Sequence, residues 1–281
     1  MIPTTRFAPS PTGYLHLGHA HAALFAWRAA RAGGGRFLLR LEDIDPGRCR
    51  PDYAAAIADD LAWLGLEWDG EIRVQSHHLP DYRAALDDLA ARGLLYPCFC
   101  TRADIAREAA NSAHAPHGPD GAPLYPGICR RLTAAERAAR IAAGAPHALR
   151  LDSTRAIAEA GTLSFHELGE GRLTCHPEHV GDIILARKDA PASYHLCVTH
   201  DDALQGVTLV TRGVDLKPAT DIQRLLQTLL GYPEPTYAHH PLLIGPDGKR
   251  LAKRDHAATI RDLRATHSPA RVRALAGFGE E

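Results

Sequence analysis

Long apolar stretches are missing from this 281-residue chain, although 45% of its residues are hydrophobic. No run approaches the roughly 20 apolar residues that a membrane-spanning helix needs. Residues 1–10 also lack the charged and apolar regions of a secretory signal. We therefore expect a globular cytoplasmic protein that neither enters a membrane nor is secreted. A chain of this length can bury a core large enough for two domains.

Cysteine is scarce as well, with six residues in the whole chain. So few cysteines in a chain this long favour a reducing compartment over a disulfide framework. Two of them stand close together in the motif CFC at residues 98–100, and this spacing favours a metal site. Cys49, Cys175 and Cys197 are expected to be simple thiols.

An excess of charge is absent too, because the net charge is −1 at pH 7. The molecule as a whole therefore exerts no general attraction on nucleic acid, and an RNA partner must be held by local patches. One such patch runs from residue 249 to residue 281, with eight Lys or Arg residues against four Asp or Glu residues. A solvated helix face would have the same composition.

What the sequence does contain is a nucleotide-site pattern in residues 6–20, RFAPSPTGYLHLGHA. Residues 5–8 predict a short strand, which the following prolines and glycine end. Gly18 then opens an amphipathic run that is long enough for a helix. The N-terminus of a helix attracts phosphate, and His16 and His19 are spaced to donate hydrogen bonds to the same group. Without a Cβ, Gly18 lets a base or ribose approach the backbone.

Two histidines alone could be capping or surface residues, but their context favours a family resemblance. HLGH resembles the HIGH signature of class I aminoacyl-tRNA synthetases, and RFAPSPTG is similar to the opening of glutamyl-tRNA synthetases. Glutaminyl-tRNA synthetases usually carry another residue at the position of Ser10. The resemblance implies ATP contacts from His16, Gly18 and His19, and glutamate contacts from Arg6, Ala8 and Ser10.

The segment 36–46, RFLLRLEDIDP, predicts a buried parallel strand that ends in acidic residues. Ligands of open α/β sheets bind beyond the carboxyl ends of the strands, so these acids lie in a suitable place. In the resembling family, the acid that matches Glu42 meets the α-ammonium of glutamate; a loop-capping role is the alternative. Two helices are expected next, at residues 51–66 and 80–94.

The alternation of strands and helices breaks after residue 97, where we expect an insertion. The resemblance implies an α/β class I synthetase fold, in which a Rossmann-type catalytic domain (1–97 and 182–240) is split by a domain that binds zinc and an RNA stem (98–181). Residues 241–281 would form a basic loop and a short helical stem-contact segment.

The insertion contains candidate ligands for one structural zinc ion. Three soft ligands are available: Cys98, Cys100 and Cys129. For the fourth ligand, His114 and His117 are candidates by ligand chemistry. Tyr125 is favoured by resemblance to short glutamyl-tRNA synthetase paralogues, whose zinc takes a tyrosine. Three thiols without a metal are the alternative.

The catalytic domain is expected to resume with apolar runs at residues 184–186, 194–198 and 207–210, which predict strands, and a helix at 219–230. Tyr194 and Arg212, both expected at strand ends, are similar to family residues that grip glutamate. Arg212 and Arg6 would bind the side-chain carboxylate, because a guanidinium offers bidentate geometry that lysine lacks.

The segment 248–255, GKRLAKRD, looks like the KMSKS loop of the same class. The resemblance implies that Lys253 and Arg250 contact ATP, and that His16, His19 and Lys253 are the catalytic residues. ATP would bind with Mg²⁺ as a substrate. Ala252 stands where serine is usual, so one hydroxyl contact is missing. A basic loop without this role is the alternative.

About 27 residues follow Arg254, whereas longer glutamyl-tRNA synthetases continue into an anticodon-binding domain. The resemblance therefore fits best the short paralogues that esterify the queuosine base of tRNA(Asp) with glutamate. The expected partners are L-glutamate, ATP and queuosine-containing tRNA(Asp), and the chain is expected to be a monomer. Alternatives are charging of tRNA(Glu), a non-catalytic tRNA-binding protein, and glutamylation of another small acceptor.

Overall fold

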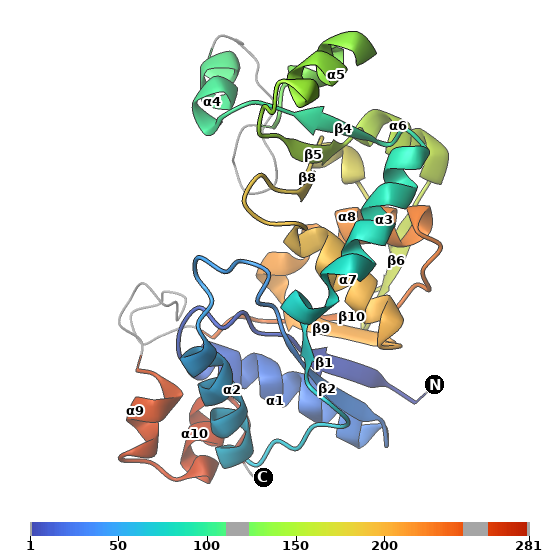
Figure 1. Ribbon diagram of the computed structural model, residues 1–281. Helices are drawn as coiled ribbons and strands as arrows, with labels where there is room; N and C mark the ends of the chain where they lie inside the picture. Colours follow the sequence, from blue (N-terminus) through green and yellow to red (C-terminus); the bar gives the residue numbers. More distant parts are fainter. Residues whose placement is uncertain (1, 111–123, 244–257, 280–281) are drawn as a thin grey trace.

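The computed structural model describes residues 2–110, 124–243 and 258–279 (Figure 1). The helices are α1 (Leu17–Ala32), α2 (Pro51–Trp63), α3 (Leu79–Ala91), α4 (Arg102–Ala110), α5 (Ala134–Ala142), α6 (Ser153–Ala160), α7 (Tyr194–Leu204), α8 (Ala219–Leu229), α9 (Ile260–Arg264) and α10 (Pro269–Leu275). Short 3₁₀ helices are η1 (Gln75–His78), η2 (Cys129–Arg131), η3 (Pro177–His179) and η4 (Val214–Leu216). The strands are β1 (Thr4–Phe7), β2 (Arg36–Leu41), β3 (Arg73–Val74), β4 (Leu95–Cys98), β5 (Ala148–Leu151), β6 (Ser164–Glu167), β7 (Gly171–Thr174), β8 (Ile184–Ala186), β9 (Leu209–Gly213) and β10 (Thr236–His240).

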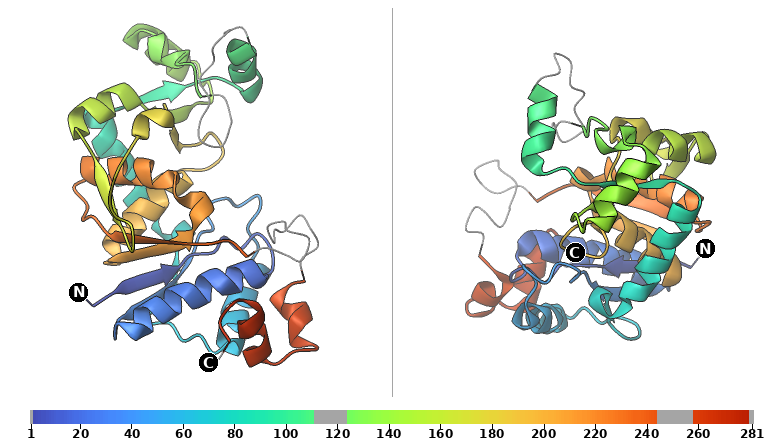
Figure 2. Two further views of the ribbon diagram at one scale, coloured as in Figure 1. Left: turned by 180° about the vertical axis from the view of Figure 1, so that it is seen from behind. Right: turned by 45° about the horizontal axis from the view of Figure 1, so that its top comes forward.

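Two groups of parallel strands form the centre of the molecule. β1, β2 and β3 are one group, with β2 in the middle, and β10 pairs in parallel with both β9 and β6. β9 lies beside β1, where the backbone N–H of Thr208 donates to the carbonyl of Thr4 at 3.0 Å. Strands from the first and the last third of the chain therefore lie together. The predicted α/β class is confirmed. α1 packs across β1, β2 and β9 (Figure 2).

A third sheet consists of β4, β5 and β8, paired antiparallel, and lies in the upper part of Figure 1 together with α4 and α5. The strand pairing does not follow the division expected from the sequence. β6 lies within the expected insertion but pairs with β10, and β8 lies in the expected second half but pairs with β5.

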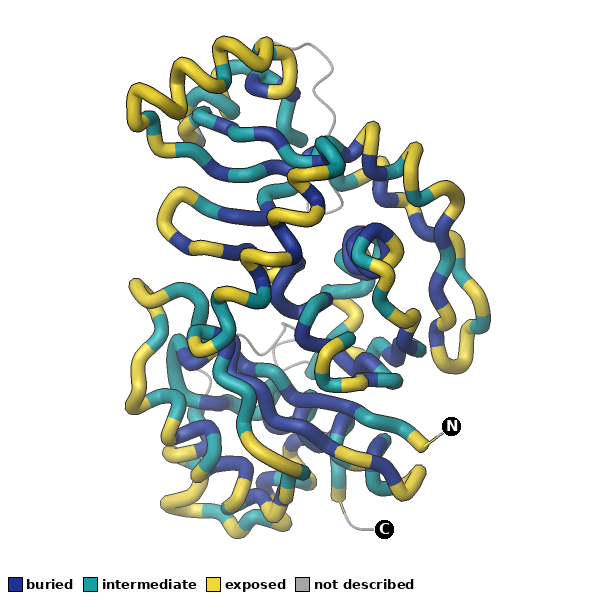
Figure 3. The backbone as a smooth tube through the Cα atoms, turned by 45° about the vertical axis from the view of Figure 1, so that its right-hand side comes forward, coloured by how far each residue is buried: buried dark blue, intermediate teal, exposed yellow. Residues whose placement is uncertain are grey.

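Apolar side chains are buried in two main clusters, one around α1 and α2 and one around α3, α7 and α8. Figure 3 shows which stretches of the backbone are buried. Ile260 of α9 and Val272 of α10 are fully buried in the first cluster. Truncating a buried aliphatic side chain of this size costs about 2–5 kcal/mol. The C-terminal helices are therefore part of the core around α1 and α2. None of the helices in the described ranges is long and apolar enough to cross a membrane.

The strand predicted at residues 194–198 is wrong, because this segment begins helix α7. Ser193 has an extended backbone at the N-cap position, and five residues of the predicted strand become the first turns of the helix. A short apolar run has the same appearance in a strand and in a buried helix, so its periodicity could not distinguish them. Tyr194 consequently lies at the start of a helix and not at a strand end.

Candidate active site

A cavity of about 430 Å³ lies at the carboxyl ends of β1 and β9. Its wall includes a set of residues that the sequence predicted for glutamate or ATP: Arg6, Ala8, Ser10, His19, Glu42, Tyr194 and Arg212. The position follows from the fold, since parallel strands that end together leave a crevice beyond their carboxyl ends. The structure thus brings together residues from three distant parts of the sequence.

The HLGH turn forms the N-terminus of α1, with His16 at the N-cap. Nδ1 of His16 accepts from the backbone N–H of Gly18 at 3.1 Å, and Nδ1 of His19 accepts from the backbone N–H of His16 at 3.2 Å. Each neutral ring must therefore carry its hydrogen on Nε2. The capping contacts fix the orientation of both rings, whose centroids are 3.9 Å apart.

Arg250, Ala252 and Lys253 lie outside the described residues, so their roles stay predictions. The chain that follows them is described from residue 258 and lies against the HLGH turn. Thr259 forms an isolated antiparallel bridge with His16, and the N–H of Ile260 donates to the carbonyl of Leu15 at 2.7 Å.

Arg6 is a buried cation that already has an anionic partner. Its Nε donates to Oδ1 of Asp202 at 2.8 Å, and its Nη1 donates to the carbonyl of Thr211 at 3.1 Å. The same oxygen of Asp202 lies 2.9 Å from Nη2 of Arg40, which is fully buried. Buried charges are retained when they are paired in this way. Asp202 therefore holds two arginines beneath the cavity.

Glu42 follows β2 at the cavity wall and is largely buried. Its Oε1 lies 3.5 Å from Nη2 of Arg40. Burial raises the pKa of Glu42 to about 7, although Arg40 and Arg6 act in the opposite direction. A cation that enters the cavity would favour the ionised form of Glu42. The predicted contact between Glu42 and the α-ammonium of glutamate requires this form.

Arg212 differs from Arg6 because its hydrogen-bond partners among the described residues are neutral. Nη1 donates to Oε1 of Gln223 at 2.6 Å, and Nη2 donates to Oγ1 of Thr220 at 2.6 Å. Nε donates to Nε2 of His239 at 3.0 Å. Although Arg212 is only 6% exposed, it forms no ion pair with any residue in the described part of the chain. A buried cation with only neutral partners is suited to bind an anionic ligand.

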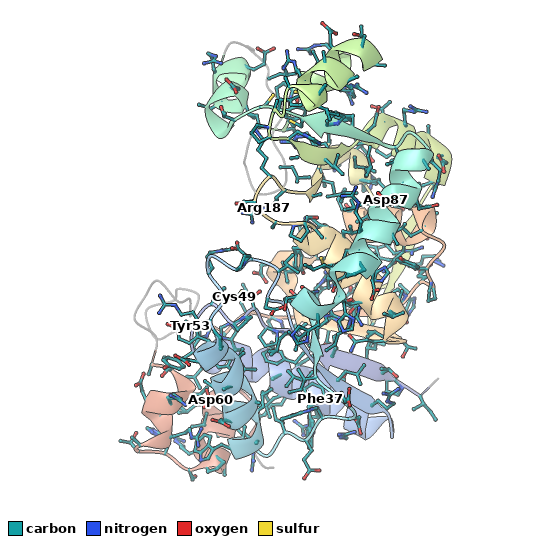
Figure 4. The ribbon with its side chains drawn as sticks, in the orientation of Figure 1. Phe37, Cys49, Tyr53, Asp60, Asp87 and Arg187 are labelled. Atoms are coloured by element: carbon teal, nitrogen blue, oxygen red, sulfur yellow. The ribbon has the colours of Figure 1, made fainter. Side chains whose placement is uncertain are left out.

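A second cavity of about 260 Å³ adjoins the first and shares Ser10, Thr12, Glu42 and Tyr194 with it. Figure 4 labels two residues of its wall, Cys49 on the loop before α2 and Arg187 on the loop after β8. His195 also lines this cavity, and burial lowers the pKa of its imidazole to about 4. The ring is therefore neutral at physiological pH.

The predicted metal ligands come together at the carboxyl end of β4, in the third sheet. The thiol sulfurs of Cys98, Cys100 and Cys129 lie within 4.8 Å of one another, and those of Cys100 and Cys129 are 3.5 Å apart. The hydroxyl oxygen of Tyr125 lies 3.4 Å from the sulfur of Cys98 and 3.6 Å from that of Cys100. His114 and His117 lie outside the described residues.

These separations fit a metal site. Ligands that lie about 2.3 Å from a tetrahedral ion are separated from one another by roughly 3.8 Å, close to the observed sulfur–sulfur distance. The guanidinium of Arg150 lies 3.9 Å from the centroid of the Tyr125 ring, and Lys188 donates to the carbonyls of Phe99 and Cys100. The cluster can therefore hold a metal ion.

Sequence reasoning missed the charged residues behind the cavity. Arg40 interrupts the apolar run of β2, and Asp201 and Asp202 follow the apolar start of α7. Asp201 accepts from Arg73, Gln75 and Tyr82. A charged residue within an otherwise apolar run was the signal that could have identified this network, because such a residue is buried only with a partner.

Comparison with known proteins identifies the family. Residues 3–273 match the family model described as tRNA synthetases class I (E and Q), catalytic domain. A protein from Rhodobacter capsulatus named Glutamyl-Q tRNA(Asp) synthetase is 51% identical, covering 98% of this chain and 99% of that protein. A protein of the same name from Nocardia farcinica is 49% identical, over 96% of this chain and 82% of that protein.

Longer proteins match as well. The glutamate–tRNA ligase of Aquifex aeolicus is 40% identical over 92% of this chain and 53% of its own length. A crystal structure of a glutamate tRNA ligase from Elizabethkingia meningosepticum in complex with its amino acid has a TM-score of 0.75 and 26% identity, over 91% of this chain and 52% of that one. The chain spans about half the length of these two proteins. It belongs to the class I glutamyl- and glutaminyl-tRNA synthetases.

Proposed function

We propose that this protein activates L-glutamate with ATP and transfers the glutamyl group to the queuosine base in the anticodon of tRNA(Asp). The observation that carries the proposal is the match, over nearly the full length of both chains, to the Rhodobacter capsulatus protein named Glutamyl-Q tRNA(Asp) synthetase. The cavity supports the choice of glutamate, because Glu42 offers an anion for the ammonium group and Arg212 offers a cation that has no anionic partner in the part of the chain that the structure describes.

Activation needs little covalent chemistry from the protein. The α-carboxylate of glutamate attacks the α-phosphorus of ATP in line, giving glutamyl-adenylate and pyrophosphate. Negative charge develops on the phosphate oxygens, where the N-terminus of α1 and the Nε2 hydrogens of His16 and His19 would stabilise it. Lys253 and Arg250 are proposed to contact the same phosphates, and Mg²⁺ to accompany the nucleotide.

Transfer requires a hydroxyl of the acceptor to reach the carbonyl carbon of the adenylate. Attack of the hydroxyl oxygen forms the ester bond, AMP leaves with the bonding electrons, and the hydroxyl proton passes to the departing phosphate or to water. A-form stems are recognised largely through shape and backbone, so the third sheet with its helices is proposed to bind an anticodon stem. The basic residues Arg261 and Arg271 would add salt-sensitive phosphate contacts. The monomeric state and the cytoplasmic location stay predictions.

The first experiment measures glutamate-dependent exchange between ATP and pyrophosphate in the absence of tRNA. Exchange is expected, and its absence would contradict activation. His19→Ala should lower the rate about 10²- to 10³-fold, as loss of one donor to developing charge does. An unchanged rate would remove His19 from the mechanism.

The second experiment identifies the acceptor. Labelled glutamate is supplied with queuosine-containing tRNA(Asp), with the same tRNA lacking the modified base, and with tRNA(Glu). We expect label only on the first, and nuclease mapping should place it in the anticodon. Label on a terminal adenosine would instead favour ordinary charging of tRNA(Glu).

We also propose that the cysteine cluster holds one structural zinc ion, with Cys98, Cys100, Tyr125 and Cys129 as ligands. Four protein ligands would close the site, as in structural zinc sites. Elemental analysis should find one zinc per chain. Tyr125→Phe should speed zinc loss to a chelator roughly tenfold or more, whereas Cys49→Ser, a thiol outside the cluster, should not. Equal rates of loss in both variants would exclude the tyrosine.

A further inference from the structure

Arg212 is held by a row of side chains that crosses the sheet behind the cavity. Adjacent strands β9, β10 and β6 supply Arg212, His239 and Glu167, and Arg212 and His239 are register partners. Nε of Arg212 donates to Nε2 of His239 at 3.0 Å, and Nδ1 of His239 donates to Oε2 of Glu167 at 2.7 Å. These contacts form a continuous chain from the cavity into the protein.

The row is buried and fixed at both ends. The side chains of His239 and Glu167 are 1% and 3% exposed. Glu167 is the last residue of β6, and its other oxygen, Oε1, accepts from the backbone N–H of His239 at 2.8 Å. Glu167 therefore binds His239 through both the ring and the main chain, and leaves the ring little freedom to rotate.

The hydrogen bonds require a neutral imidazole. A neutral ring with its hydrogen on Nδ1 donates to Glu167 and accepts from Arg212 at the same time. A protonated ring would direct a second N–H at the guanidinium. Burial and the charge of Arg212 lower the pKa of His239, which agrees with a neutral ring. The carboxylate of Glu167 is thus separated from Arg212 by an uncharged group.

We propose that His239 and Glu167 are positioning residues that orient the guanidinium of Arg212 for the side-chain carboxylate of glutamate and leave it without an anionic partner among the described residues. This inference rests on the proposed activation of glutamate. Arg212 lines the 430 Å³ cavity, whereas His239 and Glu167 are absent from its wall. They would therefore act on the substrate only through Arg212.

A purely structural role is the competing explanation, because Glu167 also satisfies the N–H of His239 at the end of β6. The two explanations differ in what a substitution changes. Loss of structure alone would reduce stability and affect glutamate and ATP alike. Loss of orientation at Arg212 would raise the KM for glutamate, leave the KM for ATP unchanged and weaken the preference for glutamate over glutamine.

The test measures ATP–pyrophosphate exchange and thermal unfolding for four variants. His239→Leu removes the acceptor for Arg212 and should raise the KM for glutamate roughly tenfold to a hundredfold. His239→Gln should restore most of the loss, because its amide oxygen can accept from Nε of Arg212. Glu167→Gln should raise the KM for glutamate too, since one amide cannot accept from both donors of His239. His240→Gln is the matched control, a neighbouring buried histidine that contacts Pro241, and should leave the KM for glutamate within about twofold.

A KM for glutamate in His239→Leu within twofold of the wild-type value would overturn the proposal. Equal increases in the KM values for glutamate and ATP would also overturn it. The same holds if the KM for glutamate in His239→Gln is as high as in His239→Leu. Failure of the proposed function is a separate outcome, since wild-type protein would then show no glutamate-dependent exchange. If His239→Leu does not fold, the question is decided by the KM for glutamate of His239→Gln and of Glu167→Gln, each compared with that of the control His240→Gln.

Discussion

Two arginines reach the same cavity in opposite electrostatic states. Arg6 is paired with the carboxylate of Asp202, which also holds Arg40. Arg212 is surrounded by Gln223, Thr220 and His239, and is equally buried. The difference indicates a division of roles. We propose that Arg6 belongs to a network of buried ion pairs that supports the site, and that Arg212 offers its positive charge to a ligand.

Asp202→Asn should remove the ion pairs of Arg6 and Arg40 and have the largest effect of the predicted changes. It leaves Arg6 and Arg40 buried without their shared carboxylate, and breaking a buried pair costs about 3–5 kcal/mol of unfolding free energy. Denaturant unfolding would measure the loss. The control is Asp87→Asn, on the exposed face of α3 (Figure 4), whose pair with Arg83 lies on the surface and should contribute about 0.5 kcal/mol or less. Equal losses in the two variants would contradict the assigned role of Asp202.

Gln223→Glu should make Arg212 resemble Arg6, because it gives Arg212 an anionic partner. Nε2 of Gln223 has no hydrogen-bond partner among the described residues, so the substitution removes no contact. We expect stability to be kept or increased and the KM for glutamate to rise roughly tenfold to a hundredfold, because the new carboxylate competes with the substrate. Exchange kinetics would measure this. An unchanged KM would show that the charge of Arg212 is not used.

The pH dependence of glutamate use should show a smaller effect from Glu42. Burial raises the pKa of this carboxyl to about 7, so its anionic form is lost as the pH falls through that value. Binding of the α-ammonium needs the anion. We therefore expect kcat/KM for glutamate to fall about tenfold per pH unit below about pH 7, while kcat at saturating glutamate changes less. A flat kcat/KM profile between about pH 6 and pH 8 would contradict this role.

The sequence predicted the parts of the site that lie in contiguous motifs. The HLGH turn at the start of α1 and the acid after β2 could be located from short apolar runs and the residues that end them. Asp202 and His239 could not be located in this way, because the role of each depends on a partner far away in sequence. The partner is Arg6 for Asp202 and Arg212 for His239. The error at α7 has a similar origin. Its first turns are apolar because they are buried between other elements, and this burial is a property of the whole fold.

The most direct test of the account compares glutamate with glutamine in ATP–pyrophosphate exchange, using wild-type protein and Arg212→Gln. If Arg212 binds the side-chain carboxylate, the wild-type protein should prefer glutamate strongly, because glutamine would leave the buried cation uncompensated. Arg212→Gln should lose most of its activity with glutamate and most of this preference. Comparable kcat/KM values for the two amino acids in the wild-type protein, or an intact preference in the variant, would contradict the assignment.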